Sequence, residues 1–205
     1  MSAHQEIPVL DIRPSLLPYA RLLETRPLEE IEMIVLHCTE LPDLDTAREY
    51  GERVRYPETG TGNSGHYYLD RDGATELWVP ENRVAHHVHG FNRRSLGIEL
   101  VNSGRCPDWY HSRHQAMLEP YPEPQIDALL RLIAALAGRL PSLRSIAGHE
   151  DLDLSTVPAS DDARLEVRRK RDPGEQFPWP TVLSACGLPR FKPQVGRETA
   201  SGPSP

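Results

Sequence analysis

Three residues of types that bind metals stand far apart in the chain: His37, His149 and Asp172. His37 follows an apolar, β-branched run, His149 lies in Ala-Gly-His-Glu-Asp, and Asp172 lies in Lys-Arg-Asp-Pro-Gly. Two histidines and one carboxylate form a three-ligand catalytic zinc set that leaves a fourth position for water. Each residue alone is more typical of a hydrogen-bonded histidine near a strand end, or of an aspartate that opens a turn. Their spacing carries no local signal.

The surrounding residues predict the elements that must position these side chains. Apolar, β-branched residues predict a buried strand over 31–36 that ends at His37, and a second buried strand over 96–101. Apolar residues at helical spacing predict a helix over 123–140. Weaker patterns predict a helix over 46–54 with a capping box at Thr46, a glycine-rich loop over 57–65, a hairpin of 66–69 with 76–79, and a helix over 179–185. This order predicts a single-domain α/β fold with a central mixed β-sheet flanked by helices.

Length and charge limit the classes of function. The chain has 205 residues and a formal net charge of -7, so we expect one main domain and no binding to nucleic acid or membrane. The three cysteines form no CxxC pair, which argues against a disulfide framework. Residues 1–27 are interpreted as an N-terminal arm, 28–187 as the domain, and 188–205 as a disordered tail rich in proline and glycine. We expect a monomer. The N-terminus has no basic start and no apolar stretch typical of a secretory signal, which favours a cytoplasmic location.

Five short motifs occur in one order along the chain. They are His37-Cys38-Thr39, Ser64-Gly65-His66-Tyr67, Ser95-Leu96-Gly97-Ile98-Glu99-Leu100, Gly148-His149-Glu150-Asp151 and Lys170-Arg171-Asp172-Pro173-Gly174. Together they resemble the zinc-dependent N-acetylmuramoyl-L-alanine amidases of the amidase 2 family, relatives of the peptidoglycan recognition proteins, over roughly residues 30–182. The resemblance implies the fold of that family, one Zn²⁺ ion, and a muropeptide or peptidoglycan substrate. The bond cut would be the amide between the lactyl group of N-acetylmuramic acid, or its anhydro form, and L-alanine.

The resemblance assigns the central residues. It makes His37, His149 and Asp172 the metal ligands, Glu99 the catalytic glutamate, and Lys170 the lysine that stabilises the oxyanion. Without the resemblance, Glu99 is more simply interpreted as a buried glutamate paired with an arginine. Lys170 is more simply interpreted as one charge of a solvated basic run.

Further candidates surround these residues. His66, His87, Asn92, Arg93 and Arg94 are predicted to contact substrate, with His86 as the alternative to His87. A second metal site among the neighbouring histidines is a weaker alternative to a cleft-lining role. The 23-residue separation of His149 and Asp172 is about twice that usual in the family, so the insert around 155–167 must bulge outwards. Asp161 and Asp162 are rival ligands, but neither has the Lys-x-Asp-Pro-Gly context.

Two functions compete on this fold. One is a zinc amidase, and the other is a non-catalytic peptidoglycan-binding domain, which usually lacks a zinc ligand. The presence of all three ligands with Glu99 and Lys170 favours the enzyme. A closed structural zinc site has little support because the chain has no cysteine-rich set. The substrate remains open between soluble anhydro-muropeptides in the cytoplasm and intact wall, which a lysin or effector exported without a signal would attack.

Overall fold

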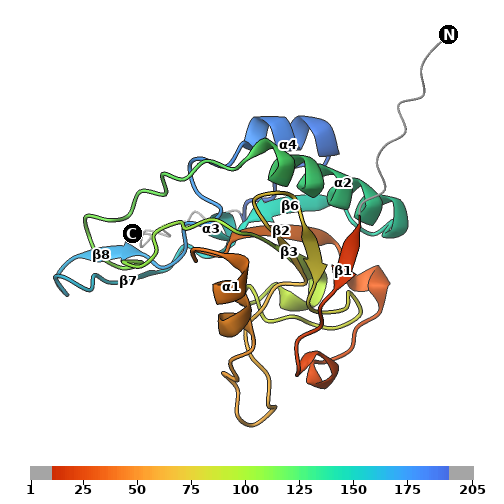
Figure 1. The fold of residues 1–205 in the computed structure, drawn as a ribbon, viewed down its shortest axis with the longest axis horizontal. Helices are drawn as coiled ribbons and strands as arrows, with labels where there is room; N and C mark the ends of the chain where they lie inside the picture. Colours follow the sequence, from red (N-terminus) through yellow and green to blue (C-terminus); the bar gives the residue numbers. More distant parts are fainter. Residues whose placement is uncertain (1–10, 194–205) are drawn as a thin grey trace, which may run out of the picture.

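The computed structural model describes residues 11–193, which form a mixed sheet with helices on both sides (Figure 1). The six strands of this sheet lie in the order β1-β4-β3-β5-β2-β6. Their bounds are β1 Ile12–Pro14, β2 Met33–Cys38, β3 Tyr67–Leu69, β4 Thr75–Leu77, β5 Ser95–Leu100 and β6 Ser145–Gly148. The α-helices are α1 Leu44–Gly51, α2 Glu123–Arg139, α3 His149–Leu152 and α4 Trp179–Cys186. The short 3-10 helices are η1 Ala20–Leu22, η2 Leu28–Glu30 and η3 Asn92–Arg94. The predicted α/β fold with a central mixed sheet is confirmed.

The central strand β2 is covered on both faces, and all six of its residues are buried. It pairs in parallel with β5 on one side and with β6 on the other. Strands in such positions are apolar without alternation, which is the pattern that predicted β2 and β5 from the sequence. Because all three strands run in the same direction, their carboxyl ends lie at one edge of the sheet. Residues that follow these strands are therefore brought close together.

Helices α2 and α4 pack together over one face of the sheet (Figure 1). The apolar stripe of α2 buries its side chains against β2, β3 and β5, with the core made of Ile126, Leu129, Leu132, Ile133, Leu136 and their strand partners. A second cluster on the other face joins α1 to Trp78 and to the N-terminal segment through Leu17, Tyr19 and Leu23. Burial on both faces fixes the sheet, and with it the edge that carries the functional residues.

The sequence patterns missed several features. The start of α1 is capped by Asp43, whose side chain accepts a hydrogen bond from the Thr46 N–H (2.7 Å), so the predicted cap at Thr46 is wrong. Strands β1 and β6 were not predicted because three or four residues give too short a pattern. The insert forms a hairpin of β7 Thr156–Pro158 and β8 Glu166–Arg168, which lies at the left of Figure 1.

The ends of the described chain pack on the sheet. Residues 11–27 include β1, which pairs in parallel with β4. Residues 188–193, expected to belong to the tail, run beside β6, where the Ile146 N–H donates to the Pro189 carbonyl (3.1 Å) and the Phe191 N–H donates to the Ile146 carbonyl (2.7 Å). The rest of the predicted tail, 194–205, lies outside the described residues. No helix within residues 11–193 has the length and apolar character needed to cross a membrane.

Candidate metal centre and cleft

Three of the predicted site residues, His37, Glu99 and His149, lie on or directly after adjacent parallel strands. His37 lies near the end of β2 and is directly opposite Glu99 of β5 in the strand register. His149 begins α3 immediately after β6, whose last residue pairs with the residue before His37. Asp172 arrives on the segment after β8, where its carbonyl oxygen accepts a hydrogen bond from the Glu150 N–H (2.9 Å).

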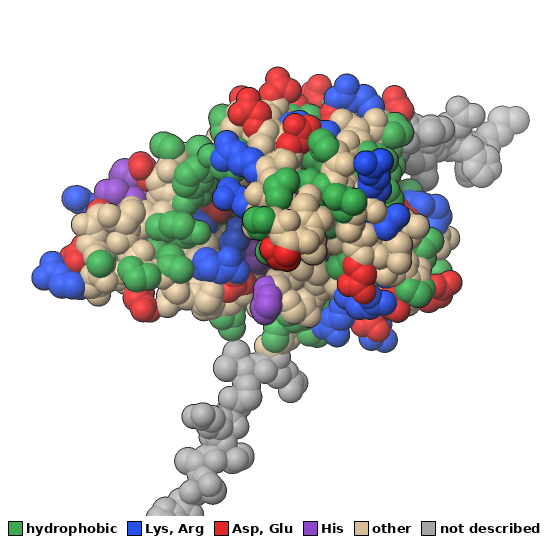
Figure 2. Space-filling view, turned by 90° about the horizontal axis from the view of Figure 1, so that it is seen from below, with side chains coloured by type: hydrophobic (Ala, Val, Ile, Leu, Met, Phe, Trp, Pro, Cys, Tyr) green, Lys and Arg blue, Asp and Glu red, His purple; other side chains and the backbone are tan. Residues whose placement is uncertain are grey.

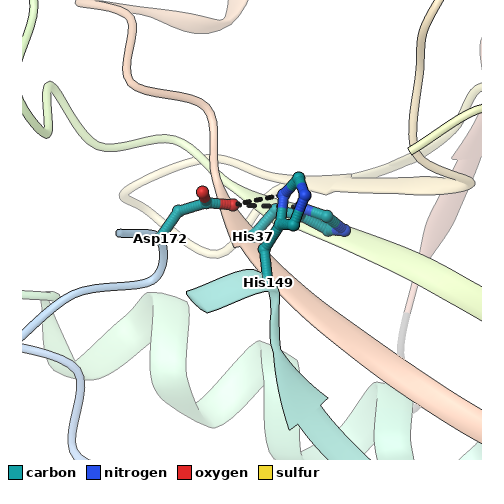
Figure 3. Close-up of side chains that lie close together, drawn as sticks. All are labelled: His37, His149 and Asp172. Atoms are coloured by element: carbon teal, nitrogen blue, oxygen red, sulfur yellow. Dashed lines mark hydrogen bonds and ion pairs between the residues drawn. The ribbon is translucent and has the colours of Figure 1, made fainter. Parts of the chain in front are cut away.

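The three predicted metal ligands meet at one point (Figure 3). The Oδ2 atom of Asp172 lies 3.0 Å from Nδ1 of His37 and 3.2 Å from Nδ1 of His149. All three side chains are buried, with exposed fractions of 1–3%. Among residues 11–193 this is the one group of three such side chains whose ligand atoms lie within 4.8 Å of one another. The prediction that these three residues come together is therefore supported by geometry.

A chain of hydrogen bonds assigns the proton on His37. The Ser95 hydroxyl donates to the Phe91 carbonyl (2.8 Å), so its oxygen accepts from Nε2–H of His87 (3.2 Å). Burial holds the pKa of His87 well below its usual range, so its Nδ1 carries no proton and accepts from Nε2–H of His37 (2.9 Å). Burial likewise lowers the pKa of His37 to about 4. The neutral His37 therefore presents an unprotonated Nδ1 to Asp172.

This arrangement fits a metal ion. An unprotonated nitrogen and a carboxylate oxygen face each other at 3.0 Å with no proton assigned between them, and a cation resolves that repulsion. Oδ1 of Asp172 and Nε2 of His149 are also buried without a hydrogen-bond partner among the described residues. Burial opposes the charge of Asp172, but His149 and Lys170 outweigh it and hold the pKa of this carboxyl well below its usual range. The donor set, two imidazoles and one carboxylate, is the type that binds zinc with an open position.

Glu99 and Lys170 line the same cleft as the three ligands. Oε1 of Glu99 lies 4.0 Å from Nδ1 of His37. Burial and the nearby Asp172 charge raise the pKa of Glu99 to about 8, although Lys170 opposes the shift. Burial disfavours the ammonium of Lys170, but Asp172, Glu40 and Glu99 together raise its pKa. Gly65 leaves room for Glu99, because a Cβ atom there would lie 2.8 Å from Cγ of Glu99.

The metal centre opens into a cleft of about 370 Å³. One wall comes from α1 and the following loop, and the other carries Arg169 and Lys170 from the base of the insert. Figure 2 shows this face, where basic side chains gather around a hollow in which histidine is visible. The exposed Arg55 also lines the cleft. A cleft with this charge suits a substrate that carries carboxylates.

The predicted substrate residues differ in their positions. His87 and Asn92 line the cleft, but His87 bonds to His37, and Oδ1 of Asn92 accepts from the backbone N–H groups of His87 and Val88. His66 is completely buried and does not line the cleft. Its Nδ1 accepts from the Gly97 N–H (3.0 Å), which joins the segment before β3 to β5.

Arg93 and Arg94 lie outside the cleft lining. Arg93 pairs with Glu24 and Glu30, and Arg94 lies 3.8 Å from Glu32, so acidic side chains of the N-terminal half account for both.

The rival ligands lie in the insert, away from the cluster. Asp161 accepts hydrogen bonds from Ser112, and Asp162 pairs with Arg164. Neither belongs to the metal-ligand cluster. His86 lines the cleft beside Tyr56, with ring centroids 5.0 Å apart.

Several residues of the site were not singled out from the sequence, and Ser95 entered only as part of a motif. Ser95 completes the hydrogen-bond chain to His37, and Arg55 and Arg169 contribute charge to the cleft. Two buried arginines, Arg26 and Arg105, hold backbone carbonyls near the site. A lone arginine in a polar stretch looks solvated, so only its distant partners reveal a buried role.

Fold and site together define a single-domain α/β protein with a cluster of two histidines and one aspartate that could bind a metal ion beside an open cleft. The family model described as N-acetylmuramoyl-L-alanine amidase (amidase 2) matches residues 27–175. The chain therefore belongs to the N-acetylmuramoyl-L-alanine amidase family, and the predicted assignment as an amidase of peptidoglycan is confirmed. No curated protein has a significantly similar sequence.

Solved structures share the fold at low identity. The N-acetylmuramoyl-L-alanine amidase LysC from Clostridium intestinale is 21% identical over 87% of this chain and 98% of its own, with a TM-score of 0.61. AmiD from E. coli, solved with the substrate anhydro-N-acetylmuramic acid-L-Ala-D-gamma-Glu-L-Lys, is 22% identical over 78% of this chain and 58% of its own, with a TM-score of 0.58. Drosophila PGRP-LB is 18% identical over 85% and 96%, with a TM-score of 0.53.

Proposed function

We propose that the protein is a zinc hydrolase that cuts the amide between the lactyl group of N-acetylmuramic acid, or its anhydro form, and L-alanine of the stem peptide. The observation that carries this proposal is the contact of Nδ1 of His37 with Oδ2 of Asp172 (3.0 Å), with Glu99 beside it in an open cleft. Family membership and the muropeptide bound in the AmiD structure support the substrate class.

His37, His149 and Asp172 hold one zinc ion in this proposal. Bound zinc supplies a Lewis acid that polarises a carbonyl group and lowers the pKa of water. Glu99 accepts a proton from the attacking water and passes it to the leaving amine nitrogen. The products are a lactyl carboxylate on the sugar and a free amino terminus on the peptide.

Lys170 supplies the second catalytic charge. Its raised pKa keeps the ammonium charged, so it can stabilise negative charge on the carbonyl oxygen as the amide is attacked. Arg55 and Arg169 line the same cleft and take the place of Arg93 and Arg94 as proposed contacts for stem-peptide carboxylates. Arg169 pairs with Asp153, which does not itself line the cleft.

Mass spectrometry of muropeptides tests this function. The protein is incubated with soluble anhydro-muropeptides and, separately, with intact sacculi, with and without a chelator. We expect release of free stem peptide that stops with chelator and returns with added zinc. The preferred substrate decides between recycling of soluble fragments and attack on the wall. Binding of muropeptide without cleavage by zinc-loaded protein would instead identify a binding domain.

A further inference from the structure

Arg105 is a buried arginine on the loop that follows β5, and all its N–H groups have acceptors. It is 3% exposed and does not line the cleft. Nε and Nη2 donate to the two carboxylate oxygens of Glu40, at 2.7 and 2.9 Å. Nη1 donates to the side-chain oxygen of Gln115 (3.1 Å). The last two N–H bonds donate to the carbonyls of Arg168 (2.9 Å) and Arg169 (3.2 Å). A guanidinium has five N–H bonds, so this one is fully used.

The backbone around Glu40 is shaped to form this pair. Glu40 has a φ of +51° and is the one non-glycine residue among 11–193 with a positive φ. A Cβ atom at Gly104 would lie 2.7 Å from Cγ of Glu40, so only glycine leaves space for the carboxylate. Backbone strain of this kind persists where the surrounding contacts enforce it, and it is common near functional sites.

The two carbonyls that Arg105 holds lead directly into the site. Arg168 and Arg169 are the residues before Lys170, whose side chain lines the cleft. Among residues 11–193 the Lys170 ammonium takes part in no hydrogen bond and in no ion pair within 4.0 Å. Its position in the cleft therefore depends on the backbone from which it projects. Asp172 has additional anchors, because its side chain contacts two histidines and its carbonyl accepts from Glu150.

We propose that Arg105, paired with Glu40, is a positioning residue that fixes the backbone of 168–170 and so directs Lys170 into the cleft. The proposal rests on the proposed function, in which Lys170 stabilises the developing oxyanion. Arg105 touches no metal ligand, and it reaches the cleft through the backbone carbonyls of Arg168 and Arg169, next to Lys170. It also connects the base of the insert to Glu40, which lies two residues after the end of β2 and three after His37.

The double variant E40Q/R105Q removes the paired hydrogen bonds between Arg105 and Glu40 without leaving a buried charge unpaired. We expect kcat to fall by about 10- to 100-fold, since one oxyanion contact is typically worth more than this when it is lost outright. Zinc affinity should stay nearly unchanged, and any rise in KM reports displacement of Arg169, the other cleft residue on the held backbone. The matched control is R164Q, an exposed arginine of the same insert that pairs with Asp162 and should leave kcat unchanged.

A double-mutant cycle decides whether Arg105 acts through Lys170. In a K170A background, E40Q/R105Q should cause almost no further loss of kcat, because the group it positions is already absent. Losses that multiply would overturn the proposal. If E40Q/R105Q fails to fold by circular dichroism, the milder E40Q, which keeps one acceptor oxygen, enters the same cycle under the same criterion.

The chain contains only two lysines, Lys170 and Lys192, which allows a test that does not need activity. In protein labelled with ¹³Cε-lysine, K192R assigns the two NMR signals. We expect E40Q/R105Q, which removes one charge of each sign, to shift or broaden the Lys170 signal at fixed pH while R164Q leaves it in place. An unchanged Lys170 signal overturns the proposal. A wild type that binds but does not cleave muropeptides would refute the proposed function, and the NMR comparison would still decide the role of Arg105.

Discussion

Replacing Ser95 with alanine tests the hydrogen-bond chain that prepares His37 for a metal. The Ser95 hydroxyl is the group that requires the His87 proton to sit on Nε2, which in turn requires His37 to carry its proton on Nε2. S95A removes this requirement. His87 can then protonate at Nδ1, and His37 can carry its proton on Nδ1, where it competes with zinc.

The magnitude follows from what the hydroxyl contacts. Loss of outer-shell partners of a metal ligand typically costs about 10- to 100-fold in metal affinity. We expect the lower end, about 10-fold, because His87 in one of its two tautomers still accepts from His37. The lost hydrogen bonds should also lower the free energy of unfolding by about 1 kcal/mol. Zinc affinity is measured by competition with a chromophoric chelator, and stability by urea denaturation.

Ser145→Ala is the matched control. Ser95 and Ser145 flank the same residue, Met33, on opposite sides of β2, and each hydroxyl donates to a backbone carbonyl. Only Ser95 contacts His87. Equal zinc affinity in S95A and S145A would refute the proton assignment, whatever their stabilities.

Three further outcomes follow from the site. E99Q should lower kcat by about 10²- to 10⁴-fold with zinc affinity unchanged, which steady-state kinetics and chelator competition together check. Glu99 acts as a carboxylate, so kcat/KM should fall as the pH falls through the pKa of Glu99. That pKa is about 8 without metal, and a bound cation lowers it. The pH profile of kcat/KM should therefore decline on its acid side below pH 8, and E99Q should lack this decline. R26M should lower the free energy of unfolding by about 3 kcal/mol or more in urea, because Arg26 donates to buried carbonyls that include that of Ser95.

Residues at the ends of buried strands could be predicted from the sequence. His37 directly follows one apolar run, and Glu99 lies near the end of another; apolar runs can be recognised from the local sequence. Their direct pairing could not be foreseen, because strand register depends on contacts between segments far apart in the chain. An insert separates Asp172 from His149, and the hairpin in that insert has no clear sequence pattern. Asp172 could therefore be predicted only from the motif around it.

Polar residues near the motifs were harder to assign. Arg93 and Arg94 stand just before the Glu99 strand, yet their acidic partners come from residues 24–32, which nothing in the local pattern indicates. His66 lies within a motif but is used for packing. Arg105 shows the opposite failure, because an arginine among polar residues gives no sign of burial until Glu40 and the insert are folded against it.

Titration of metal-free protein with zinc, followed by muropeptide cleavage at each addition, tests the central claim most directly. The account predicts no cleavage without metal, then a linear rise in cleavage rate that stops at one equivalent of zinc per chain. In H149A the rate should not rise over the same range of zinc additions. Full cleavage by metal-free protein, or the same titration curve in H149A, would contradict a catalytic zinc held by His37, His149 and Asp172.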